Sequence, residues 1–150
     1  MMMKTLLAAV ALMAAAPAMA QDASQSPAFG SVTLSAGFDD DPLQRRFRGG
    51  GPNNAARLPG SCTGNVGTPP DFRVTYAAGS APLIFRSVSM ADTTLVINGP
   101  DGRWYCDDDS FGDLDAEVRF NRPQSGVYDI WIGVVGRNEA DATLVVTERP

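Results

Sequence analysis

The sequence predicts an all-β protein, an antiparallel β-sandwich of about seven or eight strands with one disulfide bond. Short segments rich in Val, Ile, Thr and aromatic residues recur along the chain, and turn-forming residues bound each of them. Several of these segments alternate with period two, and no helical stripe of useful length follows the first 20 residues. Two cysteines, Cys62 and Cys106, offer a single pairing.

Seven segments are the clearest strands. In residues 71–77, Phe72, Val74 and Tyr76 face one side of the strand, while the residues between them face the other. The segment 126–135 has its own alternation, typical of a strand within a sheet. The seven predicted strands are 29–35, 71–77, 83–89, 93–99, 116–121, 126–135 and 142–148.

Two turn motifs predict hairpins. Asn98-Gly99-Pro100-Asp101-Gly102 separates the strand 93–99 from the segment Arg103–Cys106, and this composition favours a tight reversal. Pro123-Gln124-Ser125-Gly126 separates 116–121 from 126–135, and we expect it to join them in the same way.

The region 37–70 is long, polar and rich in Gly and Pro. Within it, LQRRFRG (43–49) predicts a short strand anchored by Leu43 and Phe47. Its charged residues suggest either an anion site or, as we favour, an edge strand that resists aggregation. These residues are Arg45, Arg46 and Arg48.

The first 20 residues predict an export signal. Lys4 precedes an apolar run over 6–16, and Ala18-Met19-Ala20 has the small-x-small pattern of a cleavage site. The apolar run is too short to span a bilayer, so a membrane anchor is the weaker alternative. We therefore expect a signal peptide over 1–20, a flexible segment over 21–28 and one domain over 29–150. The mature chain would lie in the periplasm or outside the cell, without a membrane span.

Composition excludes many functions. The 150 residues include 12 Lys and Arg, 17 Asp and Glu and no histidine, and Lys4 is the one lysine. An acidic chain without a basic run argues against nucleic acid or anionic lipid as a partner. Without histidine there is no Ser-His-Asp or Cys-His catalysis and no histidine-ligated zinc. Without lysine in the mature chain there is no Schiff-base chemistry.

The two cysteines predict a disulfide because the chain is expected to leave the cytoplasm. A bond between Cys62 and Cys106 would close a loop of 44 residues. In the chain-entropy model this stabilises the fold by roughly 4 kcal/mol. Two free thiols are the alternative. A metal site on these cysteines has no histidine or third cysteine to complete it.

The segment WYCDDDSFGDLDAE (104–117) places six carboxylates in eleven positions after a cysteine. Calcium prefers six to eight oxygen ligands, so these acids suggest a calcium site. The spacing is not that of an EF-hand, because Phe111 and Val118 fall at ligand positions. The site would be assembled across the loop, with Asp92 or the cluster Asp39-Asp40-Asp41 completing it. The alternative is a solvated loop. The candidate ligands are Asp107, Asp109, Asp113 and Asp115.

Catalysis has weaker support in the sequence. Paired-carboxylate hydrolysis needs one acid with a raised pKa, and nothing in the sequence indicates how such an acid would be buried. Ser61 and Ser110 have no base beside them.

Three aromatic residues could form a platform on which a sugar ring stacks, namely Trp104, Tyr105 and Trp131. Tyr105 follows Trp104 directly, so in a strand their side chains point to opposite faces. We expect Trp131 and Tyr128 to pack in the core. Trp104 is the candidate for exposure and ligand stacking.

Residues 92–134 resemble the second half of the bacterial pre-peptidase C-terminal (PPC-type) domain. The resemblance covers about 43 residues, and the first half of the chain follows that family only in strand order. The matching motifs are Asp92 and Leu95, Pro100-Asp101-Gly102, Asp107-Asp108-Asp109, Pro123 and Gly126, and Tyr128, Ile130 and Ile132.

The resemblance implies a jelly-roll-like sandwich, of the kind usually appended to exported enzymes as a binding or folding accessory. Some members bind calcium, and others bind matrix or polysaccharide. This sequence holds no protease domain, so we expect a free-standing secreted form that is not itself an enzyme.

The expected function is a secreted or periplasmic, non-catalytic binding or accessory module, stabilised by calcium at the acidic residues 107–117, which we expect to form a hairpin loop. Its partner would be an unidentified protein or glycan. The alternative is a module that binds polysaccharide or cell-wall material through exposed aromatics.

Overall fold

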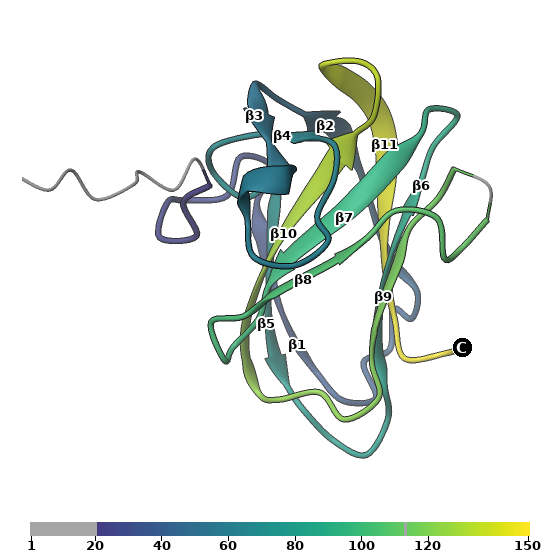
Figure 1. Cartoon of the computed structure of the whole chain (residues 1–150). Coiled ribbons are helices and arrows are strands. Elements are labelled where there is room, and N and C mark those ends of the chain that lie inside the picture. Colours follow the sequence, from purple (N-terminus) through teal and green to yellow (C-terminus); the bar gives the residue numbers. More distant parts are fainter. Residues whose placement is uncertain (1–20, 113) are drawn as a thin grey trace, which may run out of the picture.

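The computed structural model describes residues 21–112 and 114–150, so the predicted export signal lies outside the described residues. These residues form two β-sheets packed face to face (Figure 1). The larger sheet contains β1 (Ser31–Ser35), β3 (Asn53–Asn54), β4 (Asn65–Val66), β5 (Phe72–Ala77), β7 (Thr93–Asn98), β8 (Trp104–Asp107) and β10 (Gly126–Val134). The smaller sheet has the order β2 (Leu43–Gly50), β11 (Glu139–Thr147), β6 (Leu83–Val88), β9 (Glu117–Phe120).

The prediction of an all-β, two-sheet domain is confirmed. Each of the seven predicted segments contains a strand, and 43–49 is β2, an edge strand with exposed arginines and with Leu43 and Phe47 buried. The count is higher than predicted, at 11 strands in the described part of the chain, partly because β3 and β4 have only two residues each. No helix among the described residues has the length and apolarity to cross a membrane.

The larger sheet is mixed, where the sequence predicted an antiparallel arrangement. β1 pairs in parallel with β5, with Ser31 level with Arg73 and Ser35 level with Ala77. Parallel neighbours need a long connection, and the chain visits the smaller sheet as β2 between these two strands. The local alternation in each strand is the same for either direction, so it could not reveal this pairing.

One of the two predicted hairpins is confirmed. β7 and β8 pair antiparallel around the loop 99–103, with Asn98 level with Trp104. The second prediction is wrong, because β9 belongs to the smaller sheet and β10 to the larger one. Residues 121–125 therefore cross between sheets. The buried Tyr128 hydroxyl fixes this crossing: it donates to the Gln124 carbonyl at 2.8 Å and accepts from the Gln124 N–H at 3.1 Å.

The main core lies between the two sheets. Alternate side chains of β10 (Tyr128, Ile130, Ile132) face Phe85 and Leu144 of the smaller sheet within one cluster of buried residues. A fully buried side chain of this size contributes about 1.5–3 kcal/mol, so this layer supplies most of the apolar stabilisation.

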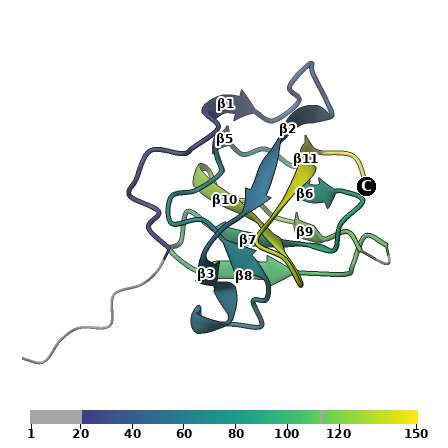
Figure 2. The same cartoon turned by 90° about the horizontal axis from the view of Figure 1, so that it is seen from above.

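A second, smaller cluster lies on the outer face of the larger sheet. Trp131 is level with Val96, which is level with Cys106, so the three share one face across β10, β7 and β8. The segment 51–66, which includes the 3₁₀ helix η1 (Ala55–Arg57), covers this face; Figure 2 shows β3 and the turn after it outside β7 and β8. β10 is consequently buried on both faces from Tyr128 to Val134. We call this the outer cluster; its buried members are Ala55, Leu58, Cys62, Val66, Val96 and Trp131.

The predicted disulfide is confirmed and fastens the outer cluster. Cys62 in the covering segment is bonded to Cys106 of β8, with their Cα atoms 5.1 Å apart. The Thr94 hydroxyl also donates to the Thr63 carbonyl at 3.0 Å. Gly133 allows this approach, because a Cβ there would lie 2.2 Å from Thr94 Oγ1.

Candidate functional site

The acidic residues after Cys106 form a connection between the two sheets. β8 ends at Asp107 in the larger sheet, and β9 begins at Glu117 in the smaller one. The sequence prediction placed these acids in a hairpin loop, and that placement is wrong because β8 and β9 do not belong to the same sheet. We call residues 107–117 the acidic crossover.

Asp107 organises this crossover by accepting hydrogen bonds from its backbone. Its Oδ2 accepts from the Ser110 N–H at 3.0 Å and from the Glu117 N–H at 2.9 Å. Its Oδ1 accepts from the Ser110 hydroxyl. One carboxylate thus ties the first residue of the crossover to the start of the next strand, the role of Asp in many turns.

The other predicted ligands do not converge with Asp107 on one point. Asp115 Oδ1 accepts from the Ser89 N–H of the β6–β7 connection at 3.0 Å. Asp109 is exposed, and Asp92 is half-buried with its backbone carbonyl bonded to the Val135 N–H. Asp113 lies outside the described residues.

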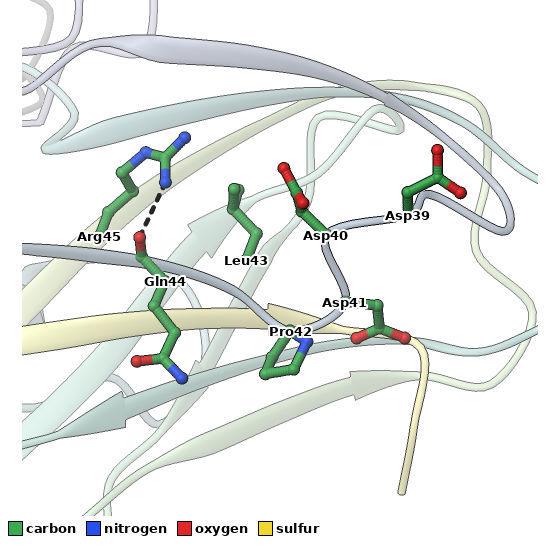
Figure 3. A pocket seen from close by; sticks show the side chains of 7 residues that line it. All are labelled: Asp39, Asp40, Asp41, Pro42, Leu43, Gln44 and Arg45. Atoms are coloured by element: carbon green, nitrogen blue, oxygen red, sulfur yellow. Dashed lines mark hydrogen bonds between the residues drawn. The ribbon is translucent and has the colours of Figure 1, made fainter.

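The second acidic cluster lies at the opposite edge of the smaller sheet. Asp39, Asp40 and Asp41 line an open hollow of about 360 Å³ beside the start of β2, and Figure 3 shows Asp41 directed away from the other two. In register, Gln44 of β2 and Glu117 of β9 are level across the four strands. Three strand spacings put these two edges roughly 14 Å apart. This distance is too long for acidic residues at one edge to share a metal ion with those at the other.

Asp41 itself is engaged in fixing the C-terminal strand. It accepts from the Thr147 hydroxyl, and its Oδ2 lies 3.3 Å from Arg149 Nε. Across residues 21–112 and 114–150, no three acidic or cysteine side chains gather as a metal ion would require. The described residues do not fit a calcium shell, and calcium binding stays a prediction from the sequence.

The surface around Trp104 is a better candidate for a ligand site than the acidic residues are. Its ring contacts Trp131 at a centroid distance of 5.3 Å and an interplanar angle of 47°, and its side chain is half-buried. It lines an open hollow of about 350 Å³ with Arg103 and Gly102 of the β7–β8 loop and with Pro59 and Gly60 of the covering segment. The lining is mainly apolar, and the Arg103 side chain is largely exposed.

The disulfide and the outer cluster hold both sides of this hollow. Cys62 lies two residues after Gly60, and Cys106 lies two residues after Trp104. Trp131, fully buried, supports the Trp104 ring from behind. As predicted, Trp131 and Tyr128 are core residues, and Trp104 is the more accessible of the two tryptophans.

Sequence reasoning missed a buried acid, Asp71. It is only 4 % exposed, and its Oδ2 accepts from the Ile132 N–H at 2.7 Å. On this side of β10, pairing with β5 ends at Ile130 and pairing with β4 begins at Val134, so the carboxylate fills a gap in the ladder. Burial raises the pKa of Asp71 to about 7, and the bond from Ile132 opposes this rise.

A second buried acid is paired with an arginine. Asp129 Oδ1 lies 2.6 Å from Arg73 Nε across β10 and β5. Burial raises the pKa of Asp129, and the hydrogen bond and charge of Arg73 oppose that rise. The sequence could predict the face on which each residue lies, since Arg73 and Asp129 both fall on the outward side of alternating strands. It could not predict that the two residues are neighbours.

Comparisons with known proteins add no relative. The chain matches no family model, and a search of curated protein sequences finds no match. What the structure establishes is therefore the architecture: the chain is an all-β, two-sheet domain with one disulfide, Cys62–Cys106.

Proposed function

We propose that this protein is a non-catalytic binding or accessory module that acts outside the cytoplasm and holds a saccharide ligand at the hollow beside Trp104. The observation that carries the proposal is the half-buried Trp104 ring, which contacts Trp131 and lines an apolar hollow next to the disulfide. A ring supported in this way keeps one orientation, so little conformational entropy is lost when a ligand packs on it.

The chemistry of the hollow suits a sugar. The apolar C–H face of a pyranose packs on an aromatic ring, and its hydroxyls accept hydrogen bonds from a donor such as a guanidinium. Trp104 and Arg103 supply these two kinds of contact from adjacent positions. Ligand sites usually combine an apolar lining with few polar groups in this manner.

Two further observations support the proposed setting. A disulfide is typical of proteins in oxidising compartments, which agrees with the export signal expected over residues 1–20. The resemblance of residues 92–134 to PPC-type domains favours an accessory role. Asp71, the carboxyl with a pKa raised to about 7, is enclosed against β10, so its environment favours a structural role over acid catalysis.

The experiment that tests the proposal is retention of the exported protein on insoluble chitin, cellulose and peptidoglycan. We expect retention on at least one of these glycans, and at least a tenfold loss in Trp104→Ala, as removal of a stacking residue from a binding surface typically costs over 1.4 kcal/mol. Phe111→Ala is the matched control, since Phe111 is an aromatic residue, 41 % exposed, on the acidic crossover.

Melting curves of both variants show whether each is folded. Retention by Trp104→Ala equal to that of the unmodified protein would contradict the proposed site. Absence of retention on all three glycans would contradict the saccharide as ligand.

A further inference from the structure

Gln21 is enclosed in a way that is unusual for its residue type. It is 3 % exposed, although glutamine is mostly found at protein surfaces. Its side-chain Nε2 and Oε1 are both buried, and neither has a hydrogen-bond partner within residues 21–112 and 114–150. Unsatisfied buried polar atoms are rare in folded proteins, and each calls for a physical explanation.

The segment that follows Gln21 is fixed against the body of the domain. The Asp22 N–H donates to the Thr68 carbonyl at 2.9 Å, and the Ala28 N–H donates to the Pro70 carbonyl at 2.8 Å. Arg73 Nη2 donates to the carbonyls of Ala23 and Gln25, at 2.7 and 3.1 Å. The position of Gln21 is thus set by bonds on the residues next to it.

Cleavage after Ala20, which the sequence predicts, would make Gln21 the first residue of the mature chain. Its α-amino group would then carry a positive charge at the point where the residue is enclosed. A buried charge without a partner is costly, and so is a buried primary amide without one. A free N-terminal glutamine would bring both to this position.

We propose that Gln21 is converted to pyroglutamate after cleavage, and that the fold encloses this uncharged lactam. The α-amino nitrogen attacks the side-chain carbonyl carbon Cδ, a new N–Cδ bond forms, and the bond from Cδ to Nε2 breaks. The Nε2 group takes up the proton that the α-amino nitrogen gives up and leaves as ammonia. No oxidant or cofactor is needed.

Ring closure removes the positive charge and one of the two unpaired polar atoms of the side chain, while Oε1 remains as the lactam carbonyl oxygen. The product has no positive charge, and the orphaned Nε2 has left the structure. The bond from the Asp22 N–H to Thr68 involves neither reacting group, so the anchoring of the segment is kept. Since the folded domain encloses residue 21, we place ring closure before this segment packs. The inference rests on the export in the proposed function but not on its ligand.

The test is mass spectrometry of the exported protein, expressed from the whole sequence and purified rapidly, with fragmentation of the N-terminal peptide. We expect a chain that begins at residue 21 and is lighter than the free-glutamine form by one ammonia. Gln21→Glu is the matched variant, because glutamate has the same shape and cyclises far more slowly. We expect it to keep a free amine and to melt several degrees below the unmodified protein.

Three results would overturn the proposal. A mature chain that begins at Gln21 with a free amine would show that no lactam forms, and a chain that begins at another residue would show that Gln21 is not the terminus. A lactam whose loss in Gln21→Glu leaves the melting temperature unchanged would show that the fold does not depend on an uncharged group here. Retention on glycans by the Gln21→Glu variant is expected to be normal, so failure of this inference is distinguishable from failure of the proposed function.

Discussion

The two faces of the larger sheet are covered in different ways. The inner face packs against a second sheet, and the main core there consists of side chains that alternate along regular strands. The outer face is covered by the irregular segment 51–66, which is held by the disulfide, the Thr94–Thr63 hydrogen bond and the close approach at Gly133. A covalent link therefore helps to stabilise the outer cluster, whereas the main core is stabilised by the packing of side chains between two sheets. It is also the part of the molecule that forms the hollow at Trp104.

The largest expected effect comes from removing the link. In the double variant Cys62→Ser, Cys106→Ser, we expect the free energy of unfolding to fall by roughly 4 kcal/mol, because the closed loop has 44 residues. Amide hydrogen exchange should increase over residues 51–66 more than in β6 and β11, which lie in the smaller sheet. Equal increases in both regions would contradict the distinction between the two faces.

The next effect is a dependence of the free energy of unfolding on pH, which arises from Asp71. Its pKa is raised to about 7 in the folded protein, against about 3.9 unfolded, so the folded state holds more protons between these values. Stability should therefore fall as pH rises from about 4 to 7, by up to about 4 kcal/mol from this group.

Asp71→Asn keeps an oxygen that accepts from the Ile132 N–H but does not titrate. Urea unfolding at several pH values should show a much weaker dependence in this variant, which should exceed the unmodified protein in stability at pH 8. Identical pH profiles for the two proteins would show that Asp71 is not held in a desolvated site.

A smaller effect is expected at the acidic crossover. Asp107→Ala removes the Oδ2 atom that accepts from the N–H groups of both Ser110 and Glu117, so both lose their partner. We expect a loss of about 1–2 kcal/mol in urea unfolding. Asp108→Ala removes the same charge from an exposed neighbour and is the control. Equal losses in the two variants would point to charge and not to the hydrogen bonds of Asp107.

The smallest expected effect is that of calcium on melting. Because Asp107 and Asp115 already accept hydrogen bonds from the backbone, we expect calcium in place of EDTA to change the melting temperature little. A clear rise with calcium that disappears in Asp107→Asn and persists in Asp108→Asn would instead establish the site that the sequence predicts.

The sequence and the structure agree where the relevant signal is local. Period-two alternation found the strands of the main core, as at Phe72, Val74 and Tyr76, and the compartment argument found the disulfide. Turn motifs located reversals but could not tell a hairpin from a crossing between sheets, which is why the connections at 107–117 and 121–125 were assigned wrongly. The burial of Asp71 depends on a gap between β5 and β4, two strands whose common neighbour β10 lies some 60 residues further along the chain.

The candidate site, like the fold, could be predicted from the sequence only in part. Trp104 was found because strand geometry separates it from Tyr105, whereas the partners that form its hollow come from the covering segment, whose path has no periodic signal. The acids were conspicuous in the sequence, but their carboxylates are used at Asp107, Asp115 and Asp41 to hold the chain's own backbone or side chains.

The central claim, that ligand packs on Trp104, is tested most directly by fluorescence. The chain has two tryptophans, and Trp131 is fully buried. Titration with soluble fragments of the glycan that retains the protein should change the emission of the unmodified protein and leave that of Trp104→Phe unchanged. An unchanged spectrum of the unmodified protein at saturating ligand, or an equal change in Trp104→Phe, would contradict the claim.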